Sequence, residues 1–224
     1  VYVPTMPEEI NRIVTDHVSD VLFAPTETAR RNLVAEGVGD AKIRLTGDVM
    51  YDAALFYGAS ARRPGWFDGL GIAEHGFVLA TIHRAENTDD AARLRRILAG
   101  LEKGGRPVVL PLHPRTKAKI AEFGITMPQN ACVVPPVGYL EMVWLEQNCL
   151  LVATDSGGVQ KEAFFHAKHC ITLRTETEWV ELVDCGWNVI VDDDSGKIAA
   201  EIRRPRDQTV RPALYGDGAA AAKI

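Results

Sequence analysis

The feature that most constrains the fold is a regular alternation of short apolar runs with helical patterns between residues 77 and 203. Short apolar runs are typical of strands buried on both faces of a parallel sheet, and hydrophobic residues spaced three and four apart mark one face of a helix. Strands that alternate with helices predict βαβ units with right-handed crossovers. We therefore predict an α/β protein with a parallel sheet covered by helices on both faces. The expected strands are 77–81, 108–110, 133–134, 150–153, 171–173 and 188–191.

The loops after these strands carry the polar and cationic residues. In parallel sheets of this kind, ligands bind beside the carboxyl ends of the strands. The sequence therefore predicts a ligand-binding edge built from the segments 83–84, 113–115, 136–138, 156–158 and 174–176.

One of these loops, Ser156-Gly157-Gly158, lies between an apolar run and a helical pattern. A tight turn into a helix leaves free backbone N–H groups at a terminus with roughly half a positive charge, which suits a phosphate. The glycines let a ligand approach the backbone closely. Glu162, one turn into the helix, is placed to accept hydrogen bonds from sugar hydroxyls. The alternative is a structural turn in which Ser156 only caps the helix.

Two histidines follow predicted strands directly. His83 is expected to point into the edge, where an imidazole can act as acid, base or phosphate donor. The alternative is a capping or solvent-facing loop histidine. His113 and Arg115 offer two further phosphate donors, with a surface ion pair as the alternative.

Arg174 ends another strand, and a planar guanidinium at that position suits a pyrophosphate. The competing interpretation is an ion pair with Glu176 or Glu178.

Composition excludes several classes of function. The net charge of −5 and the lack of a Lys/Arg run argue against nucleic-acid binding. No apolar stretch approaches the ~20 residues of a membrane helix, and no secretion signal is evident, so a cytoplasmic location is expected. The four cysteines have neither metal nor redox spacing, and we predict no metal site.

Between Tyr57 and Gly71, glycines, a proline and charged residues interrupt the hydrophobic periodicity. This segment is the best candidate for a boundary between the N-terminal region and the next domain. The N-terminal region opens with a helical pattern through Ile10 and Val14. Glu8 lies in the first turn of that helix, where a carboxylate complements the helix dipole without any functional role.

Several motifs together closely resemble those of the non-hydrolysing UDP-N-acetylglucosamine 2-epimerases, and the resemblance covers nearly the whole chain. The segments that carry it are Pro7-Glu8-Glu9-Ile10-Asn11-Arg12, Ala24-Pro25-Thr26-Glu27-Thr28, Thr46-Gly47-Asp48-Val49, Thr81-Ile82-His83-Arg84-Ala85-Glu86-Asn87, Asp155-Ser156-Gly157-Gly158-Val159-Gln160-Lys161-Glu162-Ala163 and Leu173-Arg174-Thr175-Glu176-Thr177-Glu178.

The resemblance implies a GT-B-type arrangement of two Rossmann-like domains, with most of the first domain missing from this chain. On that basis residues 1–56 form the C-terminal part of the first domain. Residues 57–198 form the second, UDP-binding domain, and residues 199–224 are C-terminal helices that cross back to the first. A homodimer is expected for the full-length protein.

The resemblance also implies the reaction, which is epimerisation at carbon 2 of a UDP-N-acetylated sugar by elimination and re-addition of UDP, without a cofactor. Two further acidic residues of the family belong to the part that is missing, so the chain alone is expected to be inactive. Glu8 is similar to an active-site carboxylate of the family, and His83 to the histidine that assists departure of the diphosphate. The expected substrate-binding residues are His113, Val137, Met142, Ser156, Gly157, Gly158, Glu162 and Arg174, with Val137 and Met142 flanking the uracil.

This chain departs from the common family pattern in three motifs. Ala85 replaces an arginine, which argues against the regulatory UDP-sugar site of some members. Many members read Gln-Glu-Glu and Thr-Glu-Arg-Pro-Glu where this chain has Lys161 and Trp179-Val180. The Trp179 change removes a cation near the nucleotide, so Arg174 or Lys161 is expected to take over that role. Together with Pro135-Pro136-Val137-Gly138-Tyr139, these changes resemble the branch that acts on UDP-2,3-diacetamido-glucuronic acid in surface-polysaccharide pathways.

Two other functions fit the same residues. A GT-B glycosyltransferase shares the phosphate-binding turn, although the Pro-Glu-Glu motif around Glu8 argues against it. A non-catalytic UDP-sugar-binding fragment is the second alternative.

Overall fold

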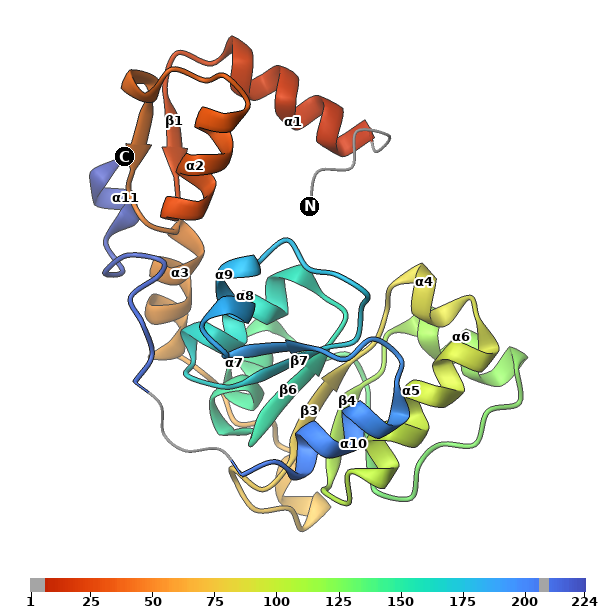
Figure 1. The fold of residues 1–224 in the computed structure, drawn as a ribbon. Coiled ribbons are helices and arrows are strands. Elements are labelled where there is room, and N and C mark those ends of the chain that lie inside the picture. The colour runs from red at the N-terminus through yellow and green to blue at the C-terminus, as the bar shows by residue number, and fades with distance from the viewer. Residues whose placement is uncertain (1–6, 206–209) are drawn as a thin grey trace. The chain divides into compact units, whose positions relative to one another are not determined.

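The structure is a computed structural model that describes residues 7–205 and 210–224, with side chains from Glu9 onward. The described residues divide into two compact units. Of the described residues, unit 1 comprises 7–56 and Arg211–Ile224, and unit 2 comprises 57–205 and Val210. Figure 1 shows the course of the chain through both.

Unit 1 contains a small parallel sheet of β1 (Leu22–Ala24) and β2 (Ile43–Leu45), with Leu22 opposite Ile43. Its core joins these strands to Leu33. Thr26 caps the helix that begins at Glu27, because its Oγ1 accepts a hydrogen bond from Ala29 N at 3.1 Å. The remaining elements are α1 (Pro7–Val18), α2 (Glu27–Ala35), η1 (Asp40–Lys42), α3 (Val49–Gly58) and α11 (Ala220–Lys223).

In unit 2, the described residues form a six-stranded parallel sheet of order β5-β4-β3-β6-β7-β8. The first strand of the unit therefore lies beside the fourth, and the strand order reverses between them. In doubly wound sheets, ligands bind at this switch point. The strands are β3 (Val78–Thr81), β4 (Val108–Pro111), β5 (Ala131–Val134), β6 (Leu151–Thr154), β7 (Cys170–Thr172) and β8 (Asn188–Ile190).

Helices cover both faces of this sheet, as Figure 1 shows. The predicted Rossmann-like α/β class is thereby confirmed. The helices of unit 2 are η2 (Phe67–Leu70), α4 (Ala85–Thr88), α5 (Ala91–Lys103), α6 (Pro114–Glu122), α7 (Tyr139–Asn148), α8 (Gly157–Phe165), α9 (Val180–Asp184) and α10 (Ser195–Arg203).

The core of unit 2 consists of two apolar layers, one on each face, because successive strand residues point to opposite sides. Val78 and Ala80 of β3 pack in the layer that contains α5 and α10. Leu79, between them, packs in the layer that contains Leu145 of α7 and Ala163 of α8. Both layers are built from buried apolar side chains, which explains why the strand sequences read as continuous apolar runs.

Helices α5 and α10 approach each other through two glycines. A Cβ atom at Gly100 would lie 2.8 Å from Cβ of Ile198, and one at Gly104 would lie 2.7 Å from Cδ1 of Ile202. Real Cβ atoms do not come this close. The two isoleucines can therefore pack directly on the backbone of α5 only because positions 100 and 104 are glycine.

We predict that Gly100→Ala destabilises the protein by about 1–3 kcal/mol, because the added methyl overpacks the contact with Ile198. An exposed helical glycine would instead gain stability on replacement by alanine, by roughly 1 kcal/mol. Urea unfolding distinguishes the two signs. The double variant Gly100→Ala, Ile198→Ala is expected to lose less than the sum of its single changes, because the clash is relieved. A stabilised Gly100→Ala variant would contradict this packing.

Three short helices of the structure were not predicted from the sequence. Helix α4 precedes α5, whose cap is Asp90. Helix α9 follows the loop after Arg174. Helix α3 was not predicted, because its apolar residues lack a single face: Leu55 and Phe56 are both exposed in the described structure.

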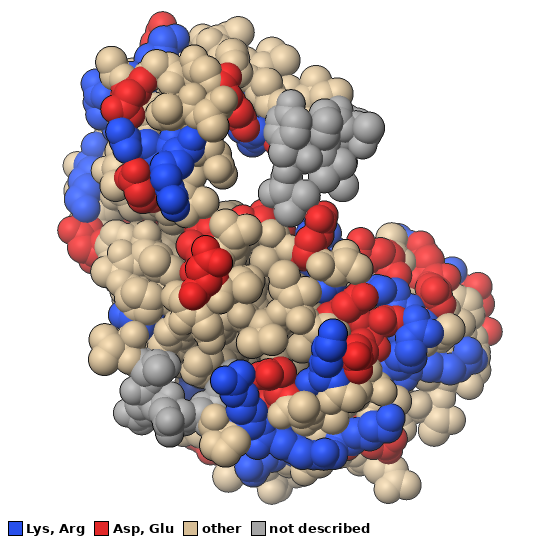
Figure 2. Space-filling model, in the orientation of Figure 1, with Lys and Arg blue, Asp and Glu red and all other residues tan. Residues whose placement is uncertain are grey.

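Acidic and basic side chains lie next to each other over α5 and the segment that enters α10 (Figure 2). Arg93 pairs with Asp192, and Arg96 pairs with Asp193. Among the described residues, no helix is both long enough and apolar enough to span a bilayer.

Candidate functional site

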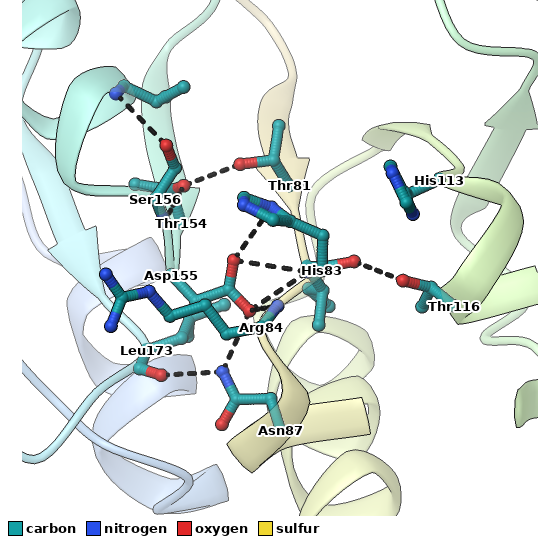
Figure 3. A network of polar contacts seen from close by, with 12 residues as sticks. Thr81, His83, Arg84, Asn87, His113, Thr116, Thr154, Asp155, Ser156 and Leu173 are labelled. Atoms are coloured by element: carbon teal, nitrogen blue, oxygen red, sulfur yellow. Dashed lines mark hydrogen bonds and ion pairs between the residues drawn. The ribbon is translucent and has the colours of Figure 1, made fainter. Parts of the chain in front are cut away.

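The loops after β3 and β6 leave the sheet side by side at the switch point. Thr81 and Thr154 are paired in register, and their hydroxyl oxygens are 2.5 Å apart. Ser156 N donates to Thr154 Oγ1 at 2.9 Å, which turns the second loop away from its strand. The sheet register therefore brings the loop of His83 next to the loop of Ser156 (Figure 3).

A fully buried carboxylate, Asp155, joins these two loops. It accepts hydrogen bonds from His83 N, Arg84 N and Asn87 Nδ2, each at 3.0 Å. His83 Nδ1 lies 3.2 Å from its Oδ1. A buried charge is costly unless hydrogen bonds surround it, and the β3 loop supplies them. The sequence reasoning missed Asp155; an acidic residue directly after a fully apolar strand was the available signal.

Asn87 extends this network to the end of β7. Its amide nitrogen also donates to the carbonyl of Leu173 at 2.9 Å, and its oxygen accepts from Arg93 Nε at 2.6 Å. Figure 3 shows Asp155 between the His83 ring and the Asn87 amide. The ends of three neighbouring strands, β3, β6 and β7, are thus fixed to one another.

The N-terminus of α8 combines a cap with unused donors. Ser156 is the N-cap, and its hydroxyl accepts from Val159 N at 3.5 Å. Within the described residues, no acceptor meets the N–H groups of Gly157 or Gly158. Two free donors at the positive end of a helix form a site for an anionic group such as phosphate.

The loop between β7 and α9 covers one side of this terminus. Trp179 Nε1 donates to the carbonyl of Gly157 at 2.8 Å, and the Glu178 carboxylate lies against Gly157. Arg174, which is buried, donates to Glu178 at 2.7 Å. The ion pair that the sequence analysis gave as an alternative for Arg174 is therefore present. Lys161 lies 4.3 Å from the centre of the Trp179 ring.

We expect the two glycines of α8 to respond differently to alanine. Gly158→Ala should raise the free energy of unfolding by about 0.4–1 kcal/mol, because its Cβ meets nothing closer than Ser156 Oγ at 3.9 Å. Gly157→Ala should lower it by roughly 1–2 kcal/mol, since the methyl group displaces Glu178 from Arg174. Urea unfolding of the pair measures both. Equal stabilities would show that Glu178 does not press on Gly157.

Glu162 lies half-buried one turn beyond the glycines of α8. Burial raises the pKa of its carboxyl, while a hydrogen bond from the Tyr139 hydroxyl and the charge of Lys161 oppose that rise. Burial, together with the charge of Glu162, raises the pKa of Tyr139 to about 12, so this hydroxyl keeps its proton and remains a donor. Glu162 is thus held as an acceptor one turn beyond the free N–H groups found in the described part of α8.

A second carboxyl, Glu146 of α7, lies fully buried near Glu162. Burial, and then the negative charge of Glu162, raise the pKa of Glu146 well above its usual value. His166 Nε2 lies 3.7 Å from it. Within the described part of the chain, neither oxygen of Glu146 has a hydrogen-bond partner. Of the two neighbouring carboxyls, Glu162 therefore takes the negative charge first, and Glu146 stays neutral to higher pH.

Glu146→Gln is expected to change the pH dependence of stability. A raised folded-state pKa contributes stability below the unfolded value of 4.5, and that stability is lost as pH rises through the folded-state pKa. Glutamine cannot ionise, so the variant should gain stability relative to the parent between about pH 5 and about pH 8. Urea unfolding at both values tests this. A constant difference between the two proteins would mean that Glu146 titrates normally.

The remaining predicted residues lie as follows. His113 caps α6, its Nδ1 accepting from Arg115 N at 3.2 Å, and its ring centre is 6.1 Å from that of His83. Val137 and Met142 are half-buried against the apolar layer of α7 and α8. Glu8 belongs to α1, but its side chain lies outside the described residues. Among the residues that the structure describes, no three His, Cys, Asp or Glu side chains converge as metal ligands.

The strand order, with the N-terminus of α8 at the switch point, defines a Rossmann-type α/β fold. A family model described as UDP-N-acetylglucosamine 2-epimerase matches residues 2–224, and the chain belongs to that family. The resemblance identified from the sequence motifs is thereby confirmed.

Known relatives are similar over nearly the whole chain. It is 51% identical over 98% of its length to the UDP-2,3-diacetamido-2,3-dideoxy-D-glucuronate 2-epimerase of Pseudomonas aeruginosa, and covers 62% of that protein. It is 31% identical to the UDP-N-acetylglucosamine 2-epimerase of Escherichia coli, with 97% of this chain and 63% of that protein covered.

A solved structure shares the fold. The Methanocaldococcus jannaschii UDP-GlcNAc 2-epimerase, in complex with UDP-GlcNAc and UDP, matches with a TM-score of 0.82 at 38% identity, covering 97% of this chain and 63% of that chain. The chain thus spans less than two thirds of the length of these relatives.

Proposed function

We propose that this chain binds the UDP moiety of a UDP-N-acetylated sugar and takes part in the inversion of carbon 2. The observation that carries the proposal is the pair of free N–H groups at Gly157 and Gly158, with Glu162 one turn further along α8. A diphosphate fits the first feature and ribose hydroxyls fit the second. The names of the relatives, and the UDP-GlcNAc and UDP complex of one of them, support the same ligand.

The reaction follows from the chemistry of the substrate. The hydrogen on carbon 2 is not acidic, because no carbonyl lies next to it. Its removal becomes feasible when UDP leaves carbon 1 in the same process, giving a 2-acetamidoglucal. Protonation from the other face and return of UDP complete the inversion. The reaction needs carboxylates for proton transfer and cationic or N–H groups for the departing diphosphate.

In this proposal, each predicted residue has one task. His83 assists departure of the diphosphate, which the first turn of α8 and Arg174 hold. His113 binds beside it, and Val137 and Met142 flank the uracil. Glu8 is proposed as a proton-transfer carboxylate from its motif alone.

Two sugars are candidates for the substrate. The 51% identity to the P. aeruginosa enzyme favours UDP-2,3-diacetamido-glucuronate over UDP-N-acetylglucosamine. The ratio of the kcat/KM values for these two UDP-sugars, measured on the protein expressed from its natural gene, decides between them.

We expect the 224-residue chain to bind UDP and Glu162→Gln to weaken that binding about tenfold or more, because a hydrogen bond to a charged group contributes about 1.5–3 kcal/mol. Inorganic pyrophosphate, which has no ribose, should bind the variant and the parent equally. Titration calorimetry measures both ligands. Glu122→Gln, an exposed change that breaks only the pair with Lys119, is the matched control.

The two ligands separate the possible failures. Loss of pyrophosphate binding together with UDP binding in Glu162→Gln would contradict the ribose role. A parent chain that binds neither ligand would contradict the phosphate role of the α8 terminus.

Turnover in deuterium oxide tests the chemistry. The protein from its natural reading frame should place solvent deuterium at carbon 2 of the product, because the proton lost from one face is replaced on the other. Mass spectrometry of the recovered nucleotide sugar detects it. An unlabelled epimer would exclude elimination, and transfer of the sugar to an acceptor without an epimer would indicate a glycosyltransferase.

A cytoplasmic location and a homodimer are part of the same proposal. The four cysteines are free thiols, which fits a reducing compartment. Sedimentation analysis tests the dimer.

A further inference from the structure

We infer that Asp155 is a positioning residue for His83: it fixes the imidazole with Nδ1–H towards its carboxylate, so that Nε2 carries the proton delivered to the departing diphosphate. This inference rests on the proposed function of His83, and the sequence reasoning did not include it.

The geometry separates the two nitrogens of the ring. Asp155 has no exposed side-chain surface, whereas the His83 side chain is 41% exposed. Nδ1 lies 3.2 Å from Asp155 Oδ1, on the buried side. Nε2, on the opposite side of the ring, is left for the ligand edge, where the α8 terminus presents its free N–H groups.

The contacts of Asp155 favour one tautomer of His83. From the described residues, the carboxylate accepts the N–H groups of His83, Arg84 and Asn87, and His83 Nδ1 lies 3.2 Å from Oδ1 as an ion-pair contact. A carboxylate oxygen only accepts, so this short contact is favourable when Nδ1 carries the proton. Neutral His83 therefore has a lone pair on Nε2, and its protonated form has an Nε2–H beside a compensating negative charge.

The proposed step balances in atoms and charge. As the bond between carbon 1 and the diphosphate oxygen breaks, its electron pair stays on that oxygen. The oxygen takes the Nε2 proton, and the electrons of the N–H bond remain on neutral imidazole. Asp155 keeps its negative charge throughout, and the carbon-2 proton goes to a separate base. Re-addition of UDP reverses the transfer.

Asparagine at position 155 should reverse the tautomer. Oδ2 of Asp155 accepts three N–H donors at 3.0 Å, from His83 N, Arg84 and Asn87, whereas Oδ1 accepts only the longer 3.2 Å contact from His83 N, so the single oxygen of asparagine is favoured at the Oδ2 position. The amide nitrogen then occupies the Oδ1 position and donates to Nδ1 of His83. The neutral ring must then carry its proton on Nε2. This Nε2–H can still donate a hydrogen bond to bound UDP, but a protonated His83 ring would no longer lie beside a negative charge.

The first measurement is the tautomer itself. Long-range ¹H–¹⁵N spectra of the histidine-labelled 224-residue chain should give the Nδ1–H form for neutral His83, assigned by its loss in His83→Gln. In Asp155→Asn the signal should change to the Nε2–H form. An Nε2–H form in the parent chain overturns the inference, whether or not the variant folds.

The second measurement is a split between binding and turnover, on the protein made from its natural reading frame. Asp155→Asn should lower kcat by about 10²–10⁴-fold. Its Kd for UDP should change by less than about threefold, because the α8 terminus is unaltered. Asp194→Asn is the matched control, since this exposed cap of α10 keeps its function as asparagine.

A double-mutant cycle distinguishes positioning from a structural role. If Asp155 acts through His83, the double variant Asp155→Asn, His83→Gln should be no slower than His83→Gln alone. Additive losses, or an equal loss of UDP binding and turnover in Asp155→Asn, would overturn the inference. A parent protein that neither binds UDP nor exchanges deuterium would instead refute the proposed function, while leaving the tautomer result intact.

Discussion

The buried carboxylate of Asp155 is the group on which the loops at the switch point of unit 2 depend. A charge enclosed by protein is tolerated only when hydrogen bonds replace its hydration, and here they come almost entirely from the loop after β3. The carboxylate needs the loop after β3 to supply its hydrogen bonds. The loop that is held in this way keeps the His83 ring at the switch point of the sheet.

The two interpretations of the Ser156 turn prove to be compatible. Ser156 caps α8 by accepting from Val159 N, the third N–H group of the helix. The N–H groups of Gly157 and Gly158 precede that contact and stay available in the described structure. A helix has more unsatisfied donors at its start than one side chain can use, so the observed cap leaves room for the proposed anion site on the same turn.

Much of the fold could be predicted from the sequence, because strands that are buried on both faces read as apolar runs. The order of those strands could not, since chain order does not say that β3 lies beside β6. For the same reason Asp155 was missed: its donors belong to residues 68–72 positions away. Glu146 was missed because a buried carboxyl on α7 looks like an ordinary polar residue. Helix α9 was missed because it is only five residues long and follows a polar loop.

The close packing of α5 on α10 has a consequence for the order in which the protein can form. The two helices are joined by contacts about 100 positions apart, such as that of Arg203 with the carbonyl of Lys103. During synthesis, the surface of α5 that carries its glycines therefore stays exposed to solvent until nearly all of unit 2 has left the ribosome. Contacts of such long range slow folding, because a large loop must close before they form. The apolar layer on that face is thus the last part of the sheet to be completed and the part most exposed to association with other nascent chains.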